Sequence, residues 1–73
     1  MKITYDSEAD ALYIRLTNEP AQVTTRRLSE DVAVNCAPDG AVVGIEILDA
    51  SEYVPDIASM HEIVVEQLTG ISA

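Results

Sequence analysis

The sequence contains a single cysteine, Cys36, so no disulfide bond can form within the chain. A lone thiol is more typical of the reducing cytoplasm than of secreted proteins, and we expect a cytoplasmic location. No apolar run approaches the ~20 residues of a membrane-spanning helix. The first residues, Met1 to Tyr5, have a strand pattern rather than that of a signal peptide. We therefore expect no membrane partner.

Lysine and arginine are absent after Arg27. The first 27 residues contain four basic and four acidic side chains, whereas residues 28–73 contain nine carboxylates, which accounts for the formal net charge of −9. Such a surface repels nucleic acid and anionic lipid and favours association with basic proteins. The alternative is that the charge only maintains solubility. Neither interpretation includes a nucleic-acid partner.

Patterns that carry catalysis or bind cofactors are also missing: there is no G-x-G-x-x-G motif, no P-loop and no Ser/His/Asp set. His61 has no second histidine to share a metal with, and we expect it at the surface of a first helical turn. Cys36 is expected to be a small core residue. Glu46 is expected on the solvated face of its strand, so its closeness in sequence to Asp49 does not indicate a catalytic pair. We expect no enzyme activity, no cofactor and no metal.

Asp6, Glu8 and Asp10 alternate like the first half of a calcium-binding EF-hand loop. The second half is missing, because Ala11 stands where that loop needs glycine and Thr17 where it needs a bidentate glutamate. The interpretation we favour is a polar hairpin turn in which Asp6 and Asp10 accept hydrogen bonds from nearby backbone N–H groups.

Residues 31–48 have the pattern of a β-hairpin. Apolar residues alternate on both sides of Pro38-Asp39-Gly40, whose residue types favour a turn. A one-residue slip would turn every side chain to the other face, so the apolar pattern selects the register. The register that we predict pairs Val34 with Val43 and Val32 with Ile45, with residues 37–40 as the loop.

Three more segments, residues 2–5, 11–16 and 23–28, have strand character, and the two arginines of the last indicate an edge strand. Gly44 lies in the middle of a predicted strand and therefore indicates a bulge or a close approach by another element. Short connections between about five strands favour an antiparallel meander. The core face of the sheet is expected to carry Leu12, Ile14, Val32, Val34, Val43, Ile45 and Ile47.

A helix is expected after the sheet, over residues 55–69. Ser59 and Glu62 fit a capping box, and apolar residues follow at helical spacing. The β-branched run at residues 63–65 opposes a helix, so a last strand at residues 62–68 is the alternative. The predicted fold is α+β: a small antiparallel β-sheet of four to five strands with one C-terminal helix packed on one face. We expect a single domain, residues 1–73, with the sheet in residues 1–48.

Two stretches resemble a known family. The opening signature of the family is similar to Tyr5-Asp6-Ser7-Glu8-Ala9-Asp10-Ala11-Leu12-Tyr13-Ile14-Arg15-Leu16. Its second block is similar to Asp39-Gly40-Ala41-Val42-Val43-Gly44-Ile45-Glu46-Ile47-Leu48-Asp49-Ala50-Ser51. The family is domain-of-unknown-function family 2283, small bacterial proteins. The resemblance implies a compact sheet with a C-terminal helical segment and no established site residues. Some members are encoded beside small toxin-like proteins, which implies an antitoxin-like role by association only.

The function that the sequence predicts is a non-enzymatic protein-interaction module, an antitoxin-like or regulatory partner of a basic protein. The alternative is a small metal- or ligand-binding protein or enzyme that uses exposed carboxylates. A homodimer is also expected, because an edge strand or an exposed apolar face can pair with a second copy. The candidate partner-binding acidic face consists of Glu46, Asp49, Glu52, Glu62 and Glu66.

Overall fold

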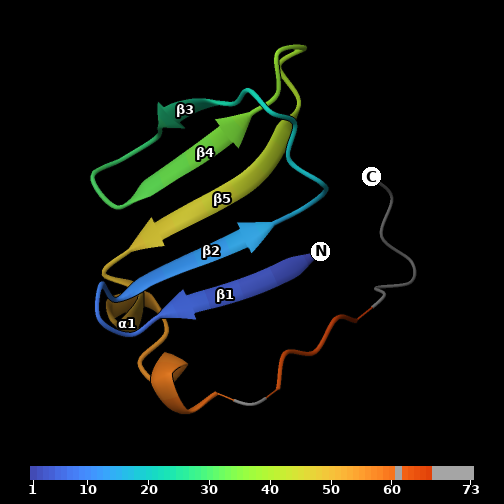
Figure 1. Ribbon diagram of the computed structural model, residues 1–73. Helices are drawn as coiled ribbons and strands as arrows, with labels where there is room; N and C mark the ends of the chain where they lie inside the picture. Colours follow the sequence, from blue (N-terminus) through green and yellow to red (C-terminus); the bar gives the residue numbers. More distant parts are fainter. Residues whose placement is uncertain (61, 67–73) are drawn as a thin grey trace.

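The computed structural model describes residues 1–60 and 62–66. Five strands form one antiparallel sheet in the order β1-β2-β5-β4-β3 (Figure 1). The strands are β1 (Lys2–Asp6), β2 (Ala11–Arg15), β3 (Thr24–Arg27), β4 (Val32–Cys36) and β5 (Val42–Leu48). A short helix, α1 (Ala50–Tyr53), and a 3-10 turn, η1 (Ile57–Ser59), follow. The predicted fold class is confirmed: a five-stranded antiparallel sheet with one short helix towards the C-terminus.

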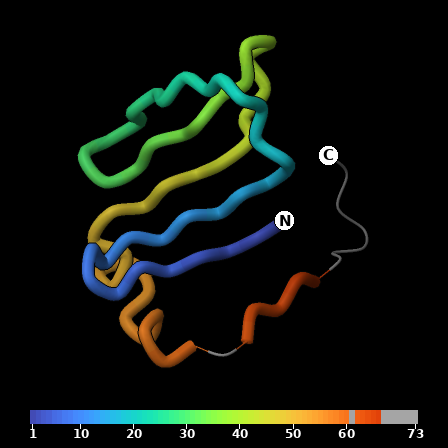
Figure 2. The backbone as a smooth tube through the Cα atoms, viewed as in Figure 1, coloured from blue at the N-terminus to red at the C-terminus, as the bar shows by residue number. Residues whose placement is uncertain are grey.

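The central strand is β5, which pairs with β2 on one side and β4 on the other. β1 and β2 form a hairpin, and β3, β4 and β5 form a meander. Residues 16–23 cross one end of the sheet to connect the two units (Figure 2), so β2-β5-β4-β3 has the strand order of a Greek key. All four residues of β3 are exposed, as predicted for an edge strand.

The register of the central hairpin differs from the predicted one by two residues. Val34 pairs with Ile45 rather than with Val43, and Val32 pairs with Ile47 rather than with Ile45. A two-residue shift keeps every side chain on its predicted face, because side chains on a strand alternate with a period of two. The apolar pattern therefore fixed the face of each residue but could not distinguish these two registers.

A β-bulge and a longer turn each contribute one residue to this shift. Asn35 pairs with Gly44 while Cys36 pairs with Val42, so Val43 is an extra residue on β5. The turn between the strands is correspondingly longer than the predicted residues 37–40, and a hydrogen bond from the Ala37 N–H to the Ala41 carbonyl (2.8 Å) closes it. The bulge lies directly beside Gly44, where the sequence predicted a bulge or a close approach.

Helical structure begins earlier than predicted and is shorter. Residue 60 and residues 62–66 belong to neither helix nor strand, so the helix predicted over residues 55–69 and the alternative strand at residues 62–68 are both wrong for them. Residues 61 and 67–69 lie outside the described part of the chain. Most helical stability in proteins comes from packing of an apolar face. Ile63, Val64 and Val65 are 53%, 63% and 78% exposed, so little packing offsets their low helix propensity.

The best-packed core lies at one end of one sheet face. Leu12, Ala50 and Ile57 are buried together there, and α1 and η1 cover this end of the sheet. Val43 and Cys36 are also buried, as predicted. The other predicted core residues are only half-buried, because four helical residues cannot cover a five-stranded sheet; these are Ile14, Val32, Val34, Ile45 and Ile47. In the described ranges, no helix is long and apolar enough to cross a membrane.

Candidate functional site

Three carboxylates meet at the end of the sheet where α1 begins. Asp31 precedes β4, Asp49 follows β5 and Glu52 lies on α1, and oxygen atoms of the three side chains all lie within 4.8 Å of one another. The Asp31 carbonyl accepts a hydrogen bond from the Leu48 N–H (2.7 Å), which holds the start of β4 against the end of β5. We call Asp31, Asp49 and Glu52 the acidic cluster.

Tyr53 borders the acidic cluster. Its hydroxyl donates a hydrogen bond to Asp31 Oδ2 (2.7 Å). This bond is the main reason why the pKa of Tyr53 is raised above its usual value, and partial burial and the nearby negative charges raise it further. Asp49 and Glu52 are exposed. Like charges this close repel one another, so a cation or a basic side chain placed among them would relieve the repulsion.

The structure brings together only part of the predicted acidic face. Asp49 and Glu52 share the cluster, whereas Glu46 is paired with Tyr13 and Ala33 and lies on the sheet face opposite α1. Glu62 and Glu66 are exposed in the irregular segment 62–66, so they are not neighbours on a helix. That the five residues bind a partner stays a prediction.

Asp31 belongs to the cluster, although the sequence analysis did not select it. In the observed register Val32 pairs with Ile47, which places Asp31 opposite Leu48 and beside Asp49. In the predicted register, in which Val32 pairs with Ile45, Asp31 would have lain opposite Glu46, two residues away from Leu48. The bulge at Val43 and the longer turn together therefore decided which carboxylates meet.

Asp10 links the first hairpin to α1. Its Oδ1 accepts hydrogen bonds from the Tyr5 hydroxyl (2.8 Å) and the Ser51 N–H (3.0 Å), and its Oδ2 accepts one from the Ser51 hydroxyl (2.6 Å). Its carbonyl accepts the Ala50 N–H (2.9 Å). Asp10 thus satisfies the first two N–H groups of α1, while the side chain of Asp49, at the N-cap position, makes no capping hydrogen bond.

The hydrogen bonds of Asp10 shift two pKa values in opposite directions. The Ser51 hydroxyl, and after it the Tyr5 hydroxyl, hold the pKa of Asp10 below its usual value. The hydrogen bond to Asp10 is also the largest cause of the raised pKa of Tyr5. Because Asp10 has a positive φ of 50°, its backbone turns the carboxylate and the carbonyl towards α1.

The half-loop that resembled an EF-hand is therefore structural. Asp6 Oδ1 accepts hydrogen bonds from the N–H groups of Glu8 (3.0 Å) and Ala9 (3.2 Å), which confirms the predicted local cap. The same prediction for Asp10 was wrong, because its carboxylate bonds to Ser51, 41 residues away in the sequence. Asp10 accepts a bond from a distant residue that the turn pattern alone could not identify.

A small cleft lies beside the core, with a volume of about 260 Å³. This is below the usual volume of a small-molecule site, roughly 300–1,000 Å³. Among the described residues, Tyr5 and Glu62 are the titratable side chains that line it, and the other described lining residues are apolar: Ile3, Leu12, Ile57, Met60 and Ile63. The described residues therefore offer no set of converging polar groups in the cleft that would orient a substrate.

The other sheet face carries a polar network. The Tyr13 side chain lies against Gly44, and its hydroxyl accepts a hydrogen bond from Asn35 Nδ2 (3.1 Å). The Thr25 hydroxyl donates in turn to Asn35 Oδ1 (2.7 Å). Gly44 thus shows both predicted features, a bulge beside it and a close approach, here by Tyr13.

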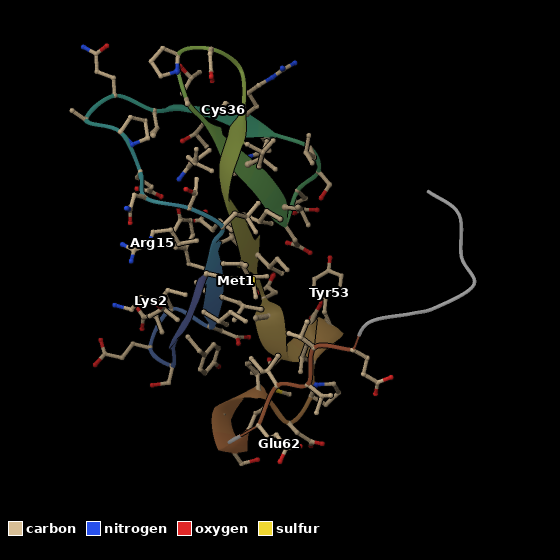
Figure 3. The ribbon with its side chains drawn as sticks, turned by 90° about the vertical axis from the view of Figure 1, so that its right-hand side faces the viewer. Met1, Lys2, Arg15, Cys36, Tyr53 and Glu62 are labelled. Atoms are coloured by element: carbon tan, nitrogen blue, oxygen red, sulfur yellow. The ribbon has the colours of Figure 1, made fainter. Side chains whose placement is uncertain are left out.

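Two basic side chains lie on the side of the sheet away from Tyr53. Figure 3 shows Lys2 and Arg15 on the side opposite Tyr53. Tyr53 is hydrogen-bonded to the acidic cluster. The acidic cluster is the candidate functional site that the charges indicate.

The family comparison covers the elements that build this end of the sheet. A family model described as a protein of unknown function (DUF2283) matches residues 2–51. This range contains all five strands and both ends of the link from Asp10 to Ser51. No curated protein and no solved structure matches the chain. Because the match spans more than half of its length, the chain belongs to the DUF2283 family of proteins of unknown function.

Proposed function

We propose that this protein is a non-enzymatic interaction module that docks a basic protein at the acidic cluster. The observation that carries the proposal is the convergence of Asp31, Asp49 and Glu52 within 4.8 Å, in a part of the sequence that contains no lysine or arginine. Two of the three carboxylates are exposed, so a partner can reach them. A regulatory or antitoxin-like role, in which this chain covers a basic surface of its partner, fits this chemistry.

The geometry of the cluster suits an arginine or lysine side chain of the partner. Charge-assisted hydrogen bonds to carboxylates are the stronger kind, and arginine can contact two oxygens at once. A basic group among the three carboxylates also removes their mutual repulsion, which gives the complex a favourable term that the free protein lacks.

The rest of the predicted acidic face acts at longer range. Glu46, Glu62 and Glu66 lie away from the cluster, but they contribute to the net charge of −9. A negative field of this kind accelerates encounter with a positively charged partner, and salt screens it. We therefore expect the cluster to determine the dissociation rate of the complex, and the remaining carboxylates to affect mainly the association rate.

The test compares two double variants of equal charge. Asp49→Asn/Glu52→Lys changes the cluster, and asparagine suits position 49 because it tolerates the left-handed backbone there (φ 51°). Glu19→Lys/Asp39→Asn is the matched control at exposed positions outside the cluster, and asparagine can still accept the Ala41 N–H as Asp39 does. Tagged proteins are used to capture partners from a lysate, and a lysine- and arginine-rich peptide serves as the direct binding probe.

We expect the cluster variant to lose the captured basic protein and to bind the peptide at least tenfold more weakly, a loss of about 1.4 kcal/mol. The control should retain most of the binding of the unaltered protein. Equal binding by both variants would contradict docking at the cluster and leave only a general charge effect.

Three carboxylate oxygens could also coordinate a divalent cation, which is the alternative function that the sequence left open. The same proteins are therefore melted with and without calcium chloride. If the cluster binds a basic protein and not a cation, calcium should leave the difference in melting temperature between the unaltered protein and the cluster variant unchanged. A rise confined to proteins with an intact cluster would favour the cation.

A further inference from the structure

β1 forms one edge of the sheet, and its outer side is unpaired in the described part of the chain. It is the first strand in the order β1-β2-β5-β4-β3, so β2 is its neighbour on the inner side. Among the described residues, no backbone hydrogen bond joins residues 2–6 to a segment other than β2. The backbone N–H and C=O groups on the outer side can therefore bind another strand.

The two edges of the sheet differ in how they are protected against such pairing. β3 carries the adjacent Arg26 and Arg27, and charged side chains on an edge strand discourage a second strand. The centre of β1 is uncharged, with the sequence Ile3-Thr4-Tyr5, and its two charged residues, Lys2 and Asp6, lie at its ends. Of the two edges, β1 is therefore the one that suits pairing.

We propose that β1 pairs with β1 of a second copy of this chain, antiparallel, about a twofold axis beside Thr4. Each of the five residues of the strand then has a partner in the other copy: Lys2 with Asp6, Ile3 with Tyr5, and Thr4 with Thr4. Opposite charges, a β-branched residue beside an aromatic one, and two threonines are all favourable pairs across neighbouring strands. The sequence of β1 is thus complementary to itself, which selects a second copy as its partner.

The surroundings of Lys2 favour a carboxylate on its outer side. Within the chain, Lys2 is paired with Arg15 of β2, and like charges directly opposite each other on neighbouring strands are destabilising. Figure 3 shows both side chains on the same side of the sheet. In the proposed dimer, Asp6 of the second copy lies beside Lys2 and supplies the opposite charge. Asp6 is exposed and is paired within its own chain with the uncharged Ala11.

The other face of β1 provides apolar contact. Ile3 and Tyr5 line the cleft beside the core, and Met60 and Ile63 line it too. Met60 is 41% exposed and Ile63 is 53% exposed. Ile3 and Tyr5 are also the residues that meet across the proposed axis, so the clefts of the two copies adjoin there. The apolar side chains around the clefts would lose exposure to water, which favours association.

The symmetry places both helices on one side of the dimer. A twofold axis between antiparallel neighbouring strands is perpendicular to the sheet, so the two sheets continue into each other without a change of face. Both copies then present α1, with Glu52, on the same side. If the proposed function is correct, a partner with two basic surfaces can bind both acidic clusters at once and gain affinity. The pairing of β1 itself does not depend on that function.

Sedimentation velocity over micromolar to submillimolar concentrations tests the proposal with variants of equal charge. Lys2→Glu places a carboxylate opposite Asp6 of the second copy, and Arg26→Glu is the matched control on the β3 edge. Lys2→Glu also removes the like-charge pair with Arg15, so the single chain should remain folded, and far-UV circular dichroism checks this.

A second pair of variants tests the register. Lys2→Glu/Asp6→Asn removes the repulsion across the axis, and asparagine can still accept the N–H groups of Glu8 and Ala9, as Asp6 does. Lys2→Glu/Asp39→Asn has the same net charge, but Asp39 lies in the turn between β4 and β5.

We expect a concentration-dependent dimer for the unaltered protein and for Arg26→Glu, and a dimer at least tenfold weaker for Lys2→Glu. Lys2→Glu/Asp6→Asn should regain part of this loss, whereas Lys2→Glu/Asp39→Asn should remain as weak as Lys2→Glu. A monomeric unaltered protein at every concentration would overturn the proposal. Equal weakening by Lys2→Glu and Arg26→Glu, or equal recovery in the two double variants, would also overturn it.

The cluster variant Asp49→Asn/Glu52→Lys lets this proposal and the proposed function fail separately. It should lose the basic protein and keep the dimer, because neither residue lies on β1. Loss of the dimer in this variant, with its fold intact, would refute pairing through β1.

Discussion

The close approach of Tyr13 to Gly44 reverses the usual effect of replacing a glycine in a strand. Glycine costs roughly 0.5–1 kcal/mol relative to alanine in the middle of a strand, so Gly44→Ala would ordinarily stabilise the protein. Here an added Cβ would collide with the Tyr13 hydroxyl and would lie 2.7 Å from the ring carbon Cζ. The tyrosine ring must therefore move before alanine can be accommodated.

The magnitude follows from what this movement disrupts. Forcing extra atoms into a packed site costs about 1–3 kcal/mol, and the low end applies because the colliding atoms are at the far end of a ring that can tilt. Tilting also breaks the hydrogen bond from Asn35 to the Tyr13 hydroxyl, worth about 1 kcal/mol. After the gain of about 0.5–1 kcal/mol from replacing glycine, we expect Gly44→Ala to lower the free energy of unfolding by about 1 kcal/mol.

A double-mutant cycle with Tyr13→Val isolates the contact. In that background the ring is absent, so Gly44→Ala should be neutral or stabilising by up to about 1 kcal/mol. The interaction energy between the two positions should then be about 1–2 kcal/mol. Tyr13→Phe removes the hydroxyl but keeps Cζ, so in that background Gly44→Ala should destabilise the protein by a smaller amount.

Urea unfolding at one fixed protein concentration measures all of these variants. With a slope near 1 kcal/mol per molar urea, as expected for a small domain, Gly44→Ala shifts the midpoint down by about 1 M. The fixed concentration is needed because self-association would add to the apparent stability. A Gly44→Ala protein as stable as the unaltered one, or an equal effect in both backgrounds, would refute the contact.

Three further predictions follow from the core and the shifted pKa values. The pKa of Asp10 is lower in the folded protein than in the unfolded chain, so the ionised carboxylate stabilises the fold above about pH 4. This stabilisation is lost as the pH falls through the folded pKa. The difference in melting temperature between the unaltered protein and Asp10→Asn should therefore shrink on acidification. Tyr53 should ionise at a higher pH than free tyrosine in an ultraviolet titration, and Asp31→Asn should lower that pKa, since the main cause of the raised pKa is removed. Ile57→Ala should reduce the free energy of unfolding by about 2–3 kcal/mol, because it leaves a cavity under α1, whereas Val65→Ala, at a position 78% exposed, should change it by less than about 0.5 kcal/mol.

Several features of the fold could be predicted because they are local. The alternation of apolar residues identified four of the five strands and the side of the sheet on which their side chains lie, and β-prone residues identified β3. The turn residues at Pro38-Asp39-Gly40 placed the central hairpin, and two arginines marked β3 as an edge. The distribution of charge, with no lysine or arginine after Arg27, is also a property of the sequence alone.

The extent of the helix could not be predicted in this way. Capping residues and helical spacing favoured residues 55–69, but a short amphipathic segment forms a stable helix only where its apolar side can pack. Ala50 and Ile57 already pack against Leu12 at this end of the sheet, and the apolar side chains of residues 63–65 remain exposed. Local propensity and tertiary packing disagreed here, and packing decided the outcome.

The candidate site depended on the tertiary structure more than the strands and their faces did. The sequence by itself determined that the second half of the chain is acidic, and it selected Asp49 and Glu52, which the fold places in one cluster. Only the fold brought Asp31 to them, because the extra residue at Val43 and a turn one residue longer than predicted together shift the pairing of β4 and β5 by two positions. A period-two pattern is unchanged by such a shift, whereas the positions of side chains at the strand ends depend on it directly. For that reason the composition of this surface could be predicted from the sequence, but the identity of the residues that meet on it could not.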